Sequence, residues 1–98
     1  MEIISLDRVY CDFKTLVDTK KVTKHNFNII SDKYCVMGHL IPIYDKLYNS
    51  DWVTDIRWDI YLEIFGHHYI HNVFKPNAKN PKYWLNKIKS AILKYGTW

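Results

Sequence analysis

A chain of 98 residues is long enough for one domain with a single hydrophobic core and offers little beyond it. The apolar share of 48% and the charged share of 24% are those of an ordinary globular protein, and no apolar run approaches the ~18 residues of a membrane-spanning helix. We therefore expect a single globular domain over residues 1–98, located in the cytoplasm, with no signal peptide and no membrane span.

The first predicted element is an amphipathic helix from Ser5 to about Asp18. Ser5 is a good N-cap, and Asp7 complements the positive end of the helix dipole. Apolar residues recur at the i, i+3, i+4, i+7 spacing of one helix face. They are Leu6, Val9, Tyr10, Phe13, Leu16 and Val17.

The segment between Asn26 and Tyr48 carries weaker signals. Its short apolar runs are interrupted by Ser31-Asp32-Lys33, which fits either a hairpin turn or a helix cap. Pro42 is expected to begin a short helix through Tyr48 rather than to interrupt a longer one.

The segment from Trp52 to Phe65 fits two templates. Every second residue from Ile56 to Ile64 is apolar, as in a half-buried strand. Positions 51, 55, 59 and 63 are acidic and positions 52, 56, 60 and 64 are apolar, as on two faces of a helix. The length of the segment favours a helix, which Gly66 would end.

The last predicted element is a helix that begins after Asn80, an N-cap, with Pro81 at its first position. Gly96 is placed to end it in a left-handed conformation. One face carries an apolar stripe and the other is rich in lysine. The apolar positions are Trp84, Leu85, Ile88, Ala91, Ile92 and Tyr95.

The expected fold is mostly α: a small single helix-rich domain in which the N- and C-terminal helices pack together. The alternative is an α+β domain with a small two- to three-stranded sheet from residues 27–65. The only cysteines, Cys11 and Cys35, have no metal or redox spacing, and both are expected to be reduced, buried thiols.

Charge is unevenly distributed along the chain. Residues 1–63 carry eight Lys or Arg and ten Asp or Glu, whereas residues 64–98 carry six Lys and no acidic residue. Lysines interleaved with aromatic rings suit the phosphates and bases of a nucleic acid. The candidate contacts to nucleic acid, or to another anionic partner, are Lys75, Lys79, Lys82, Lys87, Lys89 and Lys94.

Arginine is scarce, which bears on how a nucleic acid would be recognised. Arg8 and Arg57 are the only two, and bidentate reading of guanine normally uses arginine. Contact with the phosphate backbone is therefore expected rather than sequence reading.

A second hypothesis is a protein–protein inhibitor or adaptor. The residue usage, rich in Ile, Lys, Tyr and Asn, is typical of the AT-rich genomes of phages and viruses, whose small accessory proteins act in the host cytoplasm on a host protein or nucleoprotein complex. Exposed aromatic rings and an acidic stripe would form such an interface. The sequence does not distinguish a monomer from a homodimer. The candidate interface residues are Trp52, Asp55, Asp59, Glu63 and Trp98.

A third hypothesis concerns the histidines at positions 67, 68 and 71. Together with Asn77 and the following helix they resemble the ββα-metal core of HNH endonucleases, a resemblance that covers about twenty residues. It implies a metal-dependent nuclease with His68 as general base, Asn77 orienting it and Asn86 on the helix. The acidic residue usual beside that motif is absent, and Gly66 favours a polar turn there. Our prediction is a non-enzymatic protein with no catalytic residues, no metal and no cofactor.

Overall fold

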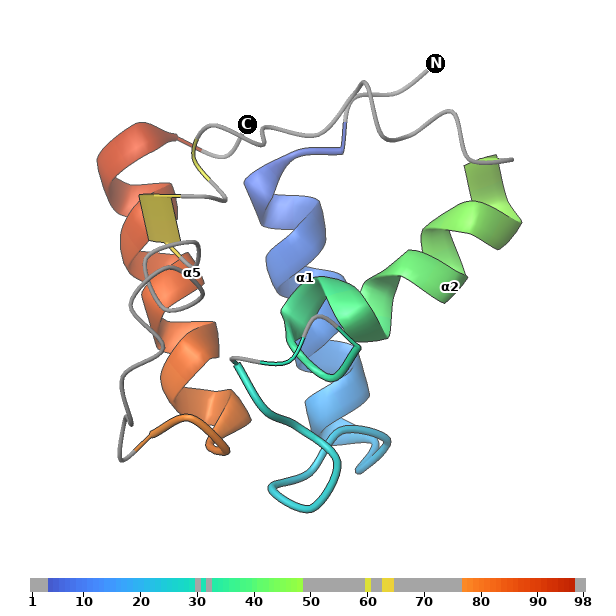
Figure 1. The fold of residues 1–98 in the computed structure, drawn as a ribbon. Coiled ribbons are helices and arrows are strands. Elements are labelled where there is room, and N and C mark those ends of the chain that lie inside the picture. Colours follow the sequence, from blue (N-terminus) through green and yellow to red (C-terminus); the bar gives the residue numbers. More distant parts are fainter. Residues whose placement is uncertain are drawn as a thin grey trace.

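The computed structural model of the protein describes residues 4–29, 31, 33–48, 60, 63–64 and 77–96. These residues contain three long helices: α1 (Leu6–Asp18), α2 (Val36–Tyr48) and α5 (Pro81–Tyr95). In Figure 1, α1 lies between the other two helices, and α5 runs beside it in the opposite direction. The prediction of a mostly α fold with packed N- and C-terminal helices is confirmed.

Helix α1 has the cap and the buried face that its sequence predicts. The Ser5 hydroxyl accepts a hydrogen bond from the backbone N–H of Arg8 at 3.1 Å. Leu6, Val9 and Phe13 are buried. The other apolar positions of the stripe pack against the same core while partly exposed.

Helix α5 begins and ends where predicted. The Asn80 side chain accepts from the backbone N–H of Tyr83, and Pro81 occupies the first turn. Gly96 ends the helix with φ of 88° and ψ of 175°. That positive φ favours glycine, but the ψ value is extended, so the ending differs from the left-handed cap that we expected. The buried residues of α5 are Pro81, Trp84, Leu85, Ile88 and Ala91.

The prediction for Pro42 is wrong, because Pro42 lies inside α2 rather than at its start. A proline ring inside a helix meets the carbonyl four residues earlier and removes one hydrogen bond. Here the residue four positions earlier is Gly38. The apolar residues on both sides of Pro42, among them the buried Leu40 and Tyr44, hold the helix against the core despite the lost bond.

The α+β alternative is not supported by the described part of residues 27–65. Residues 27–29, 31 and 33–35 form turns and irregular structure, and α2 follows directly. Of the segment from Trp52 to Phe65, only Ile60, Glu63 and Ile64 are described, and each is helical. The rest of that predicted helix lies outside the described residues.

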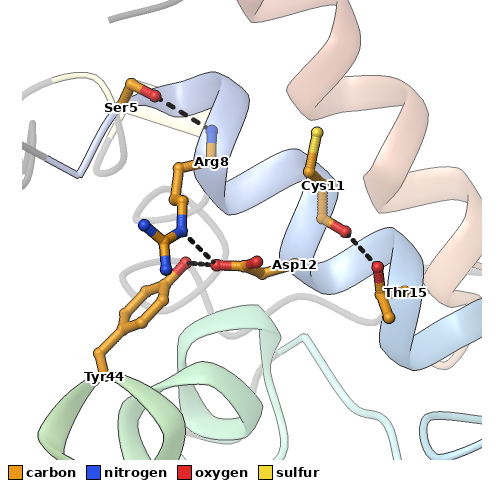
Figure 2. Close-up of polar contacts among 6 residues, drawn as sticks. All are labelled: Ser5, Arg8, Cys11, Asp12, Thr15 and Tyr44. Atoms are coloured by element: carbon orange, nitrogen blue, oxygen red, sulfur yellow. Dashed lines mark hydrogen bonds and ion pairs between the residues drawn. The ribbon is translucent and has the colours of Figure 1, made fainter. Parts of the chain in front are cut away.

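A polar contact joins α2 to α1 (Figure 2). The carboxylate of Asp12 accepts hydrogen bonds from the hydroxyl of Tyr44 at 2.8 Å and from Nε of Arg8 at 3.1 Å. Tyr44 is buried, and the guanidinium of Arg8 also lies over the ring of Tyr48 at 5.6 Å. The buried hydroxyl is therefore satisfied by a charged acceptor from the neighbouring helix.

The two cysteines are both free thiols, but only Cys35 is buried as expected. Cys11 is exposed. At 100° per residue it falls on the far side of α1 from the buried Phe13, which explains the difference. Figure 2 shows its carbonyl accepting a hydrogen bond from the hydroxyl of Thr15, at 2.9 Å.

Candidate nucleic-acid interface

The lysines predicted from the sequence do not form one surface. Lys82 and Lys89 are seven residues apart and share one flank of α5, whereas Lys87 and Lys94 share the other flank. Lys79 lies in the turn before the helix, and Lys75 lies outside the described residues. The five described lysines are all exposed.

The flank with Lys87 and Lys94 is engaged with other side chains. The Lys94 ammonium lies 3.8 Å from a carboxylate oxygen of Glu63 and 5.0 Å from the centre of the Tyr95 ring. The hydroxyl of Tyr95 also donates a hydrogen bond to Glu63. The pKa of Lys94 is raised above its usual value, first by its hydrogen bond with Tyr95 and then by electrostatic interaction with Tyr95 and Glu63.

Lys87 has a neighbour of its own on this flank. Its ammonium lies 5.3 Å from the centre of the Tyr83 ring. Tyr83 in turn meets Trp84 edge to face, with ring centres 5.0 Å apart. A carboxylate and two rings therefore already accompany the cations here, which lowers the positive charge open to a partner.

The other predicted lysines meet a basic segment that we did not single out from the sequence. Lys20 and Lys24, in the connection between α1 and α2, line the same hollow as Lys82, a space of about 470 Å³. Lys24 also lines a neighbouring hollow of about 340 Å³ together with Lys79. We call these four side chains, Lys20, Lys24, Lys79 and Lys82, the lysine cluster.

The connection between α1 and α2 is anchored to the core by apolar side chains. Val22, Phe27 and Ile29 are each at most 2% exposed. The backbone N–H of Ile29 donates to the carbonyl of Ala78 at 2.9 Å, which ties this connection directly to the turn before α5. In Figure 1 both segments lie at the same end of the molecule, where α1 ends and α5 begins.

Asn26 fixes the shape of the basic connection. Its side-chain oxygen accepts from the backbone N–H of Thr23 at 2.7 Å, and its side-chain nitrogen donates to the carbonyl of Lys21 at 2.8 Å. The Asn26 carbonyl lies 3.0 Å from Nε2 of His39, on α2. The backbone of a loop held in this way has little freedom left to lose on binding.

Lys20 has an unusual backbone conformation. Its φ is 62°, and it is the one non-glycine residue with positive φ in the described part of the chain. Its N–H donates to the carbonyl of Val17, which helps to end α1. Left-handed geometry costs a residue with a side chain roughly 1–2 kcal/mol, so glycine or asparagine is usual here. The chain nevertheless has Lys20 at this strained position, and its side chain lines the larger hollow.

No acid of the described part of the chain neutralises the lysine cluster. Within the described residues, none of its four members forms an ion pair. Asp18 borders the larger hollow, but its carboxylate lies 2.6 Å from the ammonium of Lys14. That hydrogen bond raises the pKa of Lys14. The cluster therefore keeps its positive charge open to solvent.

A sequence signal for half of this cluster exists. Residues 19–31 contain three lysines and one histidine and no acidic residue. The net charge of residues 1–63 does not reveal this basic segment, because acidic residues on either side of it outnumber its lysines. That Lys20 and Lys24 meet the start of α5 depends on the contact between Ile29 and Ala78, which no local pattern reveals.

Most residues of the other two hypotheses lie outside the described residues. This holds for Trp52, Asp55, Asp59 and Trp98 of the protein interface and for the histidines at 67, 68 and 71. Glu63 is described, exposed and paired with Lys94 as given above. Asn86 is exposed, and the carbonyl of Asn77 accepts from the indole N–H of Trp84 at 3.0 Å. Among the described residues no three metal-ligating side chains come together.

Comparison of the chain with models of protein families, with curated proteins and with solved structures found no match. None of the helices in the described ranges has the length and apolar character needed to cross a membrane.

Proposed function

We propose that this chain is a small, non-enzymatic nucleic-acid-binding protein that holds the phosphate backbone through the lysine cluster. The observation that carries the proposal is the meeting of Lys24 with Lys20 and Lys82 around one hollow and with Lys79 around the next. Four exposed cations that have no carboxylate partner among the described residues form a site for a chain of phosphates, because neutralising phosphates releases counterions and favours binding.

The chemistry of the cluster favours contact with the backbone over reading of base sequence. Lysine ammonium groups act as point charges, whereas guanine recognition relies on the two parallel hydrogen bonds of arginine. Arg8 is held by Asp12 and Tyr48. With this mode of binding, the protein binds nucleic acids of many sequences with similar affinity.

Lys89 extends the proposed surface along α5. It lies on the same flank as Lys82, about 10 Å further along the helix axis. A nucleic acid that crosses the cluster and follows this flank would avoid the side of α5 where Glu63 pairs with Lys94.

Two charge-reversed variants test the proposal. Lys24→Glu/Lys79→Glu removes two members of the lysine cluster, and Lys87→Glu/Lys94→Glu is the matched control on the other flank of α5. Each variant lowers the formal net charge from +4 to zero, so any difference between them reflects position. Fluorescence anisotropy with a labelled single strand of about 12 nucleotides, at about 50 mM salt, measures affinity.

We expect affinity to fall on the order of 100-fold in Lys24→Glu/Lys79→Glu and by less than about tenfold in the control. Equal losses in both variants would contradict the assignment to the lysine cluster. No binding by the unaltered protein would overturn the proposed function and shift attention to a protein partner.

A further inference from the structure

The smaller hollow of the lysine cluster also contains an aromatic ring. Tyr34 lines it together with Lys24, His25 and Lys79. Tyr34 is 44% exposed and is the one exposed aromatic side chain in the described part of the chain. Flat rings that stay exposed beside cations are typical of proteins that stack unpaired bases.

The other described aromatics near the lysines are used differently. Trp84 is buried and donates its indole N–H to the carbonyl of Asn77. Tyr95 donates to Glu63, and Tyr83 packs edge to face on Trp84. Packing within the molecule accounts for these rings, whereas it does not account for the exposure of Tyr34.

The backbone around Tyr34 is hydrogen-bonded, whereas its ring is 44% exposed and meets one neighbouring cation. Its N–H donates to the hydroxyl of Ser31, and its carbonyl accepts from the N–H of Asn28. The ammonium of Lys33 lies 5.6 Å from the centre of the ring. The exposed ring therefore has a cation on the adjacent residue and further cations across the hollow.

We infer that Tyr34 stacks on an unpaired base, so that the preferred ligand of the lysine cluster is single-stranded nucleic acid. This inference rests on the proposed function, because the lysines must first hold the backbone. A base in a duplex has its faces covered by its neighbours, whereas a base in a single strand has a face available to the ring.

Oligonucleotides that differ only in their bases test the inference. The probes are an adenine single strand of about 12 nucleotides, an abasic strand of the same length and phosphate number, and a duplex of the same length. The protein variants are Tyr34→Ala, Tyr34→Leu and Tyr34→Phe, with circular dichroism to confirm that each is folded. Lys24→Glu/Lys79→Glu serves as the variant of the cluster itself.

We expect the unaltered protein to bind the adenine strand about fivefold or more tightly than the abasic strand, and more tightly than the duplex. Tyr34→Ala and Tyr34→Leu should abolish the preference for the adenine strand without changing affinity for the abasic strand, whereas Tyr34→Phe should keep the preference. If Tyr34→Ala binds both strands as the unaltered protein does, while Lys24→Glu/Lys79→Glu binds neither, the stacking role is wrong and the proposed function stands. If the unaltered protein binds none of the probes, both fail.

Discussion

Charged side chains at the contact between α1 and α2 are used differently from those of the lysine cluster. Arg8 and Asp12 are partly buried, and Asp12 accepts from both Arg8 and the buried hydroxyl of Tyr44. The lysine cluster is exposed and has no carboxylate partner within the described residues. The first set holds two helices together, whereas the second contributes nothing to the core.

Charge that a small domain does not need for folding can remain on its surface, whereas charge between helices needs partners. A buried hydroxyl or a half-buried carboxylate without a partner would cost about 1–3 kcal/mol, so charge at a helix contact must be satisfied. Exposed lysines carry no such cost, since water solvates them. The ammonium groups of the four clustered lysines are therefore expected to contribute almost nothing to the free energy of folding. Their proposed contribution is to binding.

The largest expected effect separates these two sets directly. Asp12→Ala removes the carboxylate that accepts from both the buried hydroxyl of Tyr44 and Nε of Arg8. We expect the free energy of unfolding to fall by about 2–3 kcal/mol, which lowers the melting temperature by roughly 10–20 °C. Thermal unfolding followed by circular dichroism measures this loss.

Asp18→Ala is the matched control on the same helix. Asp18 pairs with Lys14 at the same i, i+4 spacing, but both side chains are more than half exposed. Its removal should change stability by less than about 0.5 kcal/mol. A loss as large as that of Asp12→Ala would contradict the contrast between buried and exposed charge.

Alkaline pH should weaken the contact between the helices. Burial, followed by the hydrogen bond to Asp12, raises the pKa of Tyr44 well above its usual value. In the unfolded chain this hydroxyl loses its proton near pH 10. Above that pH the folded state binds more protons than the unfolded state, so stability falls as pH rises.

Urea unfolding between pH 8 and pH 11 checks the direction and size of this effect. The contribution of Tyr44 approaches about 1.4 kcal/mol per pH unit once the unfolded tyrosine is ionised. Tyr44→Phe should lose about 1 kcal/mol at neutral pH, because one hydrogen bond is gone, and should show a shallower decline at high pH. Parallel curves for the two proteins would show that Tyr44 is not the group responsible.

The smallest expected effect has opposite signs for stability and for binding. Lys20→Gly relieves the positive φ of 62° and should stabilise the fold by about 0.5–1 kcal/mol. The same change removes one cation from the larger hollow and should weaken nucleic-acid binding by roughly fivefold. Lys20→Ala loses the charge without relieving the backbone. It should therefore weaken binding to the same extent and leave stability unimproved.

The sequence predicts the parts of the molecule that depend on local chemistry. Ser5 and Asn80 mark where the first and last helices begin, and the apolar stripes between the caps form the core. The prediction for Pro42 fails because local preference opposes proline inside a helix, whereas the packing of α2 overrides that preference. The capped ends of a helix are therefore easier to predict from sequence than a proline inside it that tertiary contacts tolerate.

The candidate site is only half visible from the sequence. Lys79 and Lys82 were predicted because the last third of the chain is basic. Lys20, Lys24 and Tyr34 join them only through the anchoring of the connection by Phe27 and Ile29. The separation of Lys82 from Lys87 onto different flanks follows from the helical period, and the pairing of Lys94 with Glu63 is a tertiary contact.

The salt dependence of binding measures how many phosphates the lysine cluster neutralises. Affinity for a single strand of about 12 nucleotides is measured from about 50 to about 200 mM salt, with Lys24→Gln/Lys79→Gln and Lys87→Gln/Lys94→Gln beside the unaltered protein. If the lysine cluster holds the phosphates, the slope of log affinity against log salt is shallower by about 1.4 in the first variant, because each lost contact contributes about 0.7, and nearly unchanged in the second. Equal slopes in all three proteins would contradict the account.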